Sequence, residues 1–171
     1  MNLGPLFALL FVGACVSSNP PEGGGPALPE RSHSQPLRFA YPLIDGNGAL
    51  RAEALRGEPT IVTFIATYDL ASQAQARFVS SVFGRHLGRV HATAVVLEPA
   101  ENRPLVLAFR DALKLPFPVA FGDQTLIGGE GPFGDVHAVP TTVLLDGEGR
   151  LIWKHVGLAK EDELEKALAG T

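Results

Sequence analysis

The stretch Arg56–Ser72 reads RGEPTIVTFIATYDLAS, and it decides how the rest of the chain is interpreted. Within it, residues 60–66 (TIVTFIA) form an apolar run rich in β-branched residues, which is typical of a buried strand. A helical pattern begins directly afterwards, so we predict a helix over residues 70–87. Its apolar face is formed by Leu70, Ala71, Ala74, Phe78, Val79, Val82, Phe83 and Leu87.

The chain on either side alternates strand-like and helix-like segments. Strands are predicted over residues 38–44, 90–97, 118–121, 141–145 and 151–155, and helices over 101–115 and 160–169. The helix over 101–115 carries its apolar face on Leu105, Ala108, Phe109 and Leu113. Turn-forming residues at 45–48 and 146–149 predict two β-hairpins. This order predicts an α/β domain with a central mixed β-sheet and helices on both faces.

The first segment of the chain has the character of an export signal. Residues 3–16 are uncharged and mostly apolar, too short to span a membrane but suited to a signal peptide. They include residues 12–15 (VGAC), which resemble the lipobox of bacterial lipoproteins. The resemblance implies that residues 1–14 are a signal peptide and that Cys15 is lipidated. Ordinary secretory cleavage, leaving a free thiol, and a buried N-terminal helix are the alternatives.

The next segment differs in composition from the folded part. Residues 17–36 contain five prolines and a run of three glycines, and they cannot bury enough apolar surface to offset their ordering entropy. We therefore predict that residues 15–36 hold the lipidation site and a flexible tether, and that residues 37–171 form one folded domain.

Charge and cysteine content exclude several kinds of function. The formal net charge is −4 and no run of like charges occurs, which argues against a nucleic-acid partner. Cys15 is the single cysteine, so the chain lacks an internal disulfide and a cysteine-rich zinc site. We predict no metal and no cofactor, because the histidines are scattered and none lies three or four residues from another. Those considered are His33, His86, His91 and His155.

Two motifs carry a resemblance to a known superfamily. Residues 56–68 (RGEPTIVTFIATY) resemble the approach to the active site in TlpA/ResA-like (redoxin) members of the thioredoxin superfamily. Residues 139–146 (VPTTVLLD), followed by 149–151 (GRL) and 155–157 (HVG), resemble the stretch around and after the cis-proline of those proteins. The resemblance covers about residues 37–170. It implies a three-layer thioredoxin-like fold with an N-terminal β-hairpin extension and a cis peptide bond before Pro140.

The chain departs from this family at the redox site. Where the family has Cys-x-x-Cys, this chain has Asp69 and Ser72, which cannot form a thiolate or a mixed disulfide. We predict that neither is catalytic and that Asp69 is the N-cap of the following helix. A competing helix start uses Ser72 with Gln75 as a capping box. The functional alternative is a polar site of Tyr68, Asp69 and Ser72 beside Pro140, with His137 as a candidate neighbour.

The resemblance also implies where a partner would bind. In the family, the cis-proline loop lines a groove that takes an extended chain, and the matching residues here are Tyr68, Val139, Pro140 and Thr141. We therefore predict a non-catalytic binding module for a protein or peptide. The chain is expected to be exported to the bacterial cell envelope, held on the membrane through Cys15 and facing the periplasm, or else secreted in soluble form. Two alternatives are a redoxin-type thiol–disulfide oxidoreductase or antioxidant protein, and a structural envelope lipoprotein.

Overall fold

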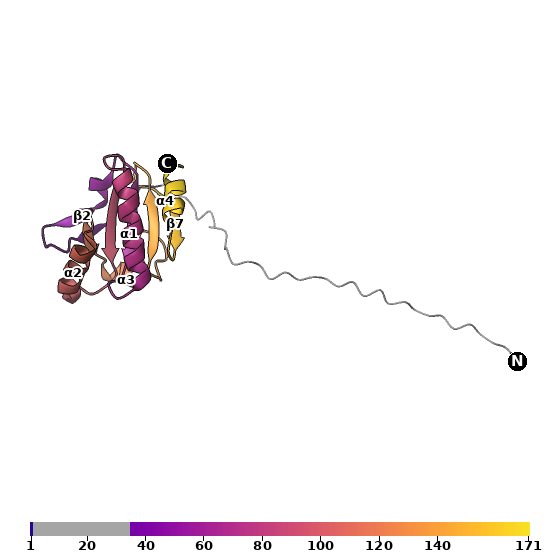
Figure 1. Cartoon of the computed structure of the whole chain (residues 1–171), viewed down its shortest axis with the longest axis horizontal. Helices are drawn as coiled ribbons and strands as arrows, with labels where there is room; N and C mark the ends of the chain where they lie inside the picture. The colour runs from indigo at the N-terminus through magenta and orange to yellow at the C-terminus, as the bar shows by residue number, and fades with distance from the viewer. Residues whose placement is uncertain (2–34) are drawn as a thin grey trace.

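A computed structural model describes Met1 and residues 35–171. The predictions for the signal peptide, for Cys15 and for most of the tether lie outside the described residues. The described part consists of two sheets with helices packed around them (Figure 1). The strands are β1 (Ala40–Pro42), β2 (Ala49–Arg51), β3 (Thr60–Ile65), β4 (His91–Val96), β5 (Val119–Phe121), β6 (Thr141–Leu145) and β7 (Leu151–Val156). The helices are η1 (Ala52–Leu55), α1 (Leu70–Arg85), η2 (Ala100–Asn102), α2 (Arg103–Leu113), α3 (Gln124–Ile127) and α4 (Glu161–Leu168).

The larger sheet is mixed, with the strand order β5-β4-β3-β6-β7. Strands β3, β4 and β5 run parallel, whereas β6 is antiparallel to both β3 and β7. In this register Phe64 of β3 lies opposite Thr141 at the start of β6. The residues that follow β3 and those that precede β6 therefore meet at one end of the sheet. This end holds the residues that the two sequence motifs single out.

The central strand β3 is buried on both faces, as its continuous apolar run predicts. Ile61 and Ile65 pack in one core cluster with side chains of α1, α2 and α4. Val62 and Phe64 pack in a second cluster on the opposite face, against the N-terminal segment, α3 and the loop after it. Three layers result, and the predicted α/β fold with a central mixed sheet is confirmed.

The predicted N-terminal hairpin is also confirmed. Strands β1 and β2 pair antiparallel around the turn at residues 45–48, where Leu43 N donates to Gly48 O at 3.0 Å. The hairpin lies beside the edge strand β5, since Ile44 N donates to Val119 O at 3.0 Å. The short helices η1 and α3 were not predicted, because each spans only four residues and shows no helical periodicity.

The predicted apolar faces of the two long helices are partly wrong. Leu70 and Leu87 are 78% and 71% exposed, although both were assigned to the buried face of the first helix. Two polar residues, Ser72 and Gln75, are buried there instead. They tolerate burial because their side-chain oxygens accept backbone N–H groups, Ala66 N at 3.2 Å and Ala159 N at 2.7 Å respectively.

In α2 the difference is a rotation of the buried face. Phe109 is buried as predicted, and Leu113 is half-buried. Leu105 and Ala108 are exposed, while Val106 is buried in their place. Only one side of α2 therefore contacts the core, and apolar side chains remain on its outer side.

Candidate functional site

Asp69 is the N-cap of α1, as predicted. Its backbone is extended (φ −99°, ψ 123°). Its Oδ2 accepts hydrogen bonds from Ser72 N at 2.7 Å and from Ser72 Oγ at 2.6 Å. The alternative helix start at Ser72 is wrong, because α1 already begins at Leu70 and the Ser72 hydroxyl is committed to Asp69 and to the backbone of Ala66.

The hydrogen bonds also define the protonation of this carboxyl group. The hydrogen bond from the Ser72 hydroxyl lowers the pKa of Asp69 below its usual value of 3.8, with smaller lowering contributions from backbone N–H groups of the first turn. Asp69 is therefore an ionised acceptor at neutral pH. Its Oδ2 is engaged by the first turn of α1.

Replacing Asp69 with alanine is expected to destabilise the domain by about 0.5–2 kcal/mol at neutral pH, because the first turn of α1 loses its cap. A folded-state pKa below the unfolded one means that this stabilisation is present above the unfolded pKa, and that it is lost as the pH falls through the folded value. Denaturant unfolding at pH 7 and at pH 3 measures both effects. If the difference in the free energy of unfolding between wild type and variant is as large at pH 3 as at pH 7, the interpretation of Asp69 as a charged cap is contradicted.

The second motif lies at the same end of the sheet. The Val139–Pro140 peptide bond is cis, as the resemblance implies, and Pro140 O accepts Gly157 N at 2.8 Å. Val139 is half-buried and Pro140 is buried. Thr141 is fully buried, and its hydroxyl donates to Ala138 O at 2.7 Å. Of these three residues, Val139 is the one whose side chain reaches the surface.

A buried carboxylate that the sequence analysis missed anchors the loop between β3 and α1. Glu98 is 2% exposed and follows β4 by two residues. Its Oε1 accepts Thr67 N at 2.5 Å and its Oε2 accepts Asn102 Nδ2 at 2.8 Å. An acidic residue directly after an apolar strand was the available signal. Glu98 ties the loop that carries Tyr68 to the start of α2, so this loop has a defined position.

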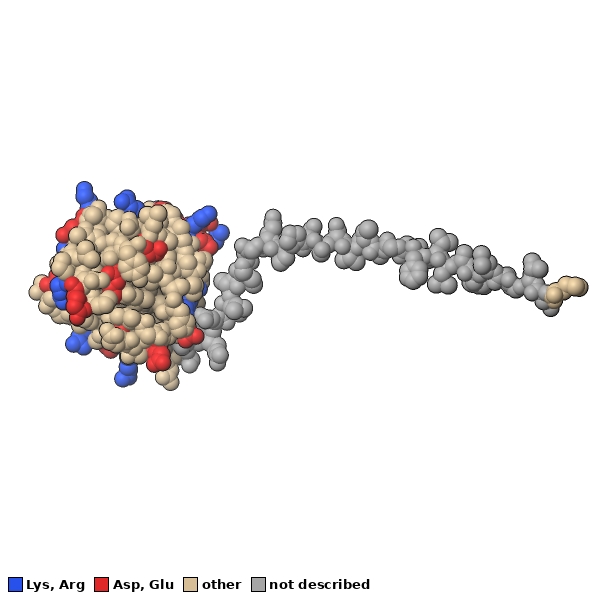
Figure 2. Space-filling model, turned by 90° about the horizontal axis from the view of Figure 1, so that it is seen from below, with Lys and Arg blue, Asp and Glu red and all other residues tan. Residues whose placement is uncertain are grey.

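Apolar side chains project from this end of the molecule. Tyr68 is 79% exposed, and it adjoins Leu70, the exposed first residue of α1. Leu105, on the outer side of α2, is 61% exposed. Figure 2 views the molecule from this end, and most of the visible surface there is neither basic nor acidic. The basic side chains lie around the rim, and a few acidic ones lie within the face. Exposed apolar groups gathered on a face with few charged side chains are typical of a protein-binding surface.

A hollow of about 450 Å³ adjoins these side chains, between the first turn of α1 and the outer side of α2. We call it the α1/α2 hollow. Its lining residues are Thr67, Tyr68, Gln73, Leu105, Ala108, Phe109, Ala112 and Leu113. None of them is charged, and most are apolar. The hollow is therefore suited to an apolar side chain from outside the domain.

Among the described residues, no hydrogen bond or ion pair joins His137 to Asp69. The side chain of His137 is 67% exposed, and its Nε2 lies 3.8 Å from Asp135 Oδ2. Among Met1 and residues 35–171, no three His, Cys, Asp or Glu side chains are grouped so that they could hold a metal ion. No helix within that part of the chain is long and apolar enough to cross a membrane.

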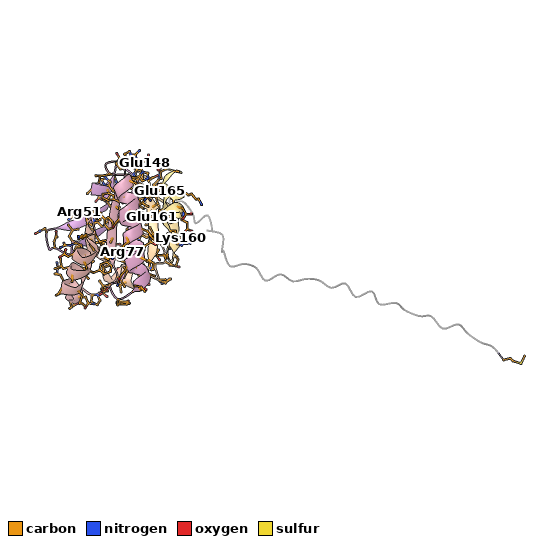
Figure 3. The ribbon with its side chains drawn as sticks, viewed as in Figure 1. Arg51, Arg77, Glu148, Lys160, Glu161 and Glu165 are labelled. Carbon is orange, nitrogen blue, oxygen red and sulfur yellow. The ribbon has the colours of Figure 1, made fainter. Side chains whose placement is uncertain are left out.

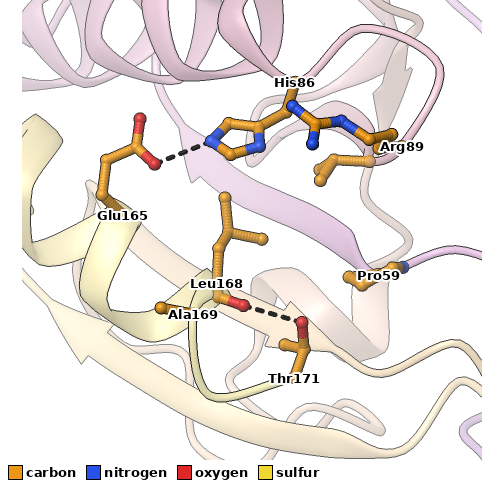
Figure 4. A pocket seen from close by; sticks show the side chains of 8 residues that line it. Pro59, His86, Arg89, Glu165, Leu168, Ala169 and Thr171 are labelled. Atoms are coloured by element: carbon orange, nitrogen blue, oxygen red, sulfur yellow. Dashed lines mark hydrogen bonds and ion pairs between the residues drawn. The ribbon is translucent and has the colours of Figure 1, made fainter.

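A second hollow lies at the opposite end of the sheet, beside Pro59 and the C-terminal turn of α4 (Figure 4). There His86 Nε2 and Glu165 Oε2 are 2.7 Å apart, and Arg85 Nε donates to Glu165 Oε1 at 2.9 Å. The hydrogen bond with His86, followed by that from Arg85, lowers the pKa of Glu165. Both carboxylate oxygens are thus engaged in holding α4 against the end of α1. This is a structural contact and not a free acid–base pair.

Comparisons with known proteins identify the fold. No family profile matches the sequence, and no curated protein matches it at a significant level. Solved structures do match. A thioredoxin family thiol:disulfide interchange protein from Chlorobium tepidum TLS has a TM-score of 0.68 at 18% identity, covering 81% of this chain and 95% of that one. A DsbF homologue from Corynebacterium diphtheriae has a TM-score of 0.72 at 10% identity, covering 88% and 96%.

StoA from Bacillus subtilis is also similar, with a TM-score of 0.60 at 22% identity, covering 83% of this chain and 98% of that one. Identities this low establish the fold alone. The chain therefore has a thioredoxin-like fold, and the resemblance drawn from the two sequence motifs is confirmed at that level.

Proposed function

We propose that this thioredoxin-like domain is a non-catalytic binding module that recognises a protein or peptide at the carboxyl end of β3. The observation that carries the proposal is the pairing of Asp69 with Ser72 at 2.6 Å, on a face where Tyr68 and Leu70 are exposed. The two redox positions are filled by a helix cap, so thiol chemistry has been replaced by a structural contact. Exposed apolar side chains lie beside them.

The exposure of apolar side chains on a fixed loop favours binding over a purely structural role. Tyr68 and Leu70 each expose more than three-quarters of their surface, although the loop between them is held in place by the Asp69 cap and by Glu98. A fixed backbone that presents large apolar side chains to solvent gains nothing for its own stability. It does lower the entropy lost when a partner covers those side chains.

The proposal includes export and membrane attachment through Cys15. Its support is the apolar segment over residues 3–16 that ends near a lipobox-like VGAC, together with the proline- and glycine-rich segment that follows. The structural neighbours include a protein described as a secreted disulfide oxidoreductase from Mycobacterium tuberculosis, which agrees with an exported setting. Labelling with radioactive palmitate, compared between wild type and Cys15→Ser, tests the anchor directly.

Photo-crosslinking tests the binding proposal. A benzophenone amino acid at position 68 of the full chain is expected to give a discrete protein adduct in the native cell envelope. Leu70→Asp in the same chain is expected to weaken binding about 10- to 100-fold, because a Leu side chain contributes about 1.5–3 kcal/mol when fully buried. The adduct should therefore be lost.

Leu87→Asp is the matched control. Leu87 lies just after α1 and is 71% exposed. Its replacement by aspartate is therefore the same chemical change at the other end of the helix. An adduct lost with Leu70→Asp and kept with Leu87→Asp supports the proposal. An adduct kept by both variants, or the absence of any adduct from position 68, contradicts it.

A further inference from the structure

The α1/α2 hollow has a chemical character that narrows the kind of partner. Its eight lining residues include no charged side chain. Tyr68 and Leu105 form exposed apolar edges of the hollow. Phe109 is only 9% exposed, so it lies deeper. A charged or strongly polar group placed here would lose hydration without gaining a partner. The group that fits is an aliphatic or aromatic side chain.

A cation lies one helical turn away from this hollow. Arg77 follows the lining residue Gln73 by four positions, so both lie on the same face of α1, about 6 Å apart along its axis. Arg77 is exposed, on the half of α1 that lies beside α2 (Figure 3). Helical side chains lean toward the N-terminus, which directs Arg77 toward Gln73 and the hollow.

The charge of Arg77 is available to a partner. Most other arginines of α1 and α2 are engaged: Arg85 pairs with Glu161 and Glu165, and Arg110 pairs with Asp111. Within residues 35–171, no ion pair or hydrogen bond involves the Arg77 side chain. An uncharged apolar hollow with an unpaired guanidinium one helical turn away is complementary to an apolar side chain near a carboxylate.

The spacing of these two features matches an extended peptide. Side chains two residues apart on an extended chain point the same way and lie about 6.4–6.8 Å apart, close to the rise of about 6 Å between Gln73 and Arg77. We infer that the α1/α2 hollow takes an apolar anchor side chain of an extended protein segment, and that Arg77 pairs with a carboxylate two residues from that anchor. This inference rests on the proposed function, since it specifies the partner of the same face.

Peptide titrations followed by amide chemical shifts test the inference on the full chain. The probes are three acetylated nonapeptides: SSESLSESS, which carries the anchor and a carboxylate on both sides; SSKSLSKSS, which reverses the charges; and SSESSSESS, which lacks the anchor. The first is expected to shift amides of residues 67–77 and 105–113. Its affinity should be about two- to fivefold higher than that of the lysine peptide, as expected for an exposed ion pair. Its affinity should be about tenfold or more higher than that of the peptide that lacks the anchor.

Arg77→Glu is expected to reverse the preference between the glutamate and lysine peptides. Arg51→Glu, which changes the same charge at an exposed position on β2, is the matched control and should leave the preference unchanged. Equal binding of the two charged peptides by wild type, or a preference that Arg77→Glu does not alter, overturns the inference.

The shift map separates this inference from the proposed function. Shifts confined to Asp69 and residues 139–141 overturn the hollow as the anchor site, while binding at the carboxyl end of β3 still stands. Absence of shifts with all three peptides also overturns the inference. The crosslink from position 68 then decides the proposed function by itself, because it uses the native partner and no synthetic peptide.

Discussion

Replacing both Asp69 and Ser72 with cysteine is expected to give the chain a dithiol–disulfide exchange activity, which we do not expect of the wild type. The side chains of these residues already touch, with Asp69 Oδ2 and Ser72 Oγ 2.6 Å apart, so two sulfurs would lie within reach of a disulfide. A cysteine at the N-cap of α1 would have its thiol pKa lowered by the helix terminus. Insulin reduction by dithiothreitol, measured in a Cys15→Ser background, should rise roughly tenfold or more above the uncatalysed rate.

The single variants are the controls for this experiment. Asp69→Cys or Ser72→Cys alone provides one thiol and should not form an intramolecular disulfide, so neither should match the double variant. Circular dichroism shows whether the double variant is folded, since it also removes the cap. Insulin reduction by the wild type after its thiol is blocked would contradict the non-catalytic proposal and would favour the redoxin-type alternative.

Replacing Phe133 with alanine is expected to destabilise the domain by about 3–5 kcal/mol, the largest stability effect that we predict. Phe133 is fully buried, and its ring centroid lies 5.0 Å from that of Phe39 and 5.0 Å from that of Phe64. It joins the loop between α3 and β6 to the central strand and to the N-terminal segment. Thermal unfolding should show a fall in melting temperature of roughly 10–20 °C.

Leu105→Ala is the matched control, because it also truncates a large apolar side chain but at a position that is 61% exposed. Its effect on the free energy of unfolding should stay within about 0.5 kcal/mol. If Phe133→Ala lowers the free energy of unfolding by less than about 1 kcal/mol, the loop leading to Val139 is not packed on the sheet.

The sequence predicts the secondary structure well where burial is complete. Residues 60–66 and 90–97 were assigned as strands and correspond to β3 and β4, because a strand covered on both faces is a continuous apolar run. The faces of α1 and α2 were predicted less well. Periodicity ranks residues by polarity. It cannot show that the side-chain oxygens of the buried Ser72 and Gln75 accept backbone N–H groups of the β3–α1 loop and of the segment before α4.

The candidate site likewise has features that the sequence predicts and features that it does not. The cap at Asp69 and the cis bond before Pro140 followed from local sequence, one from N-cap preference and the other from the motif. Glu98 and the α1/α2 hollow did not. Glu98 lies 31 residues from its partner Thr67, and the hollow is formed by α1 and α2, which are separated by a strand.

The amino-acid sequence by itself determined the class of fold, the loss of the redox pair at positions 69 and 72, and the helix cap that replaces it. Each of these depends on neighbouring residues or on a pattern along one element. The tertiary structure decided which apolar side chains are left exposed. Leu70 and Leu105 read as core residues along the chain, yet they are exposed, because α1 and α2 present other faces to the sheet. Exposure depends on how helices pack, and packing is set by contacts between segments far apart in sequence.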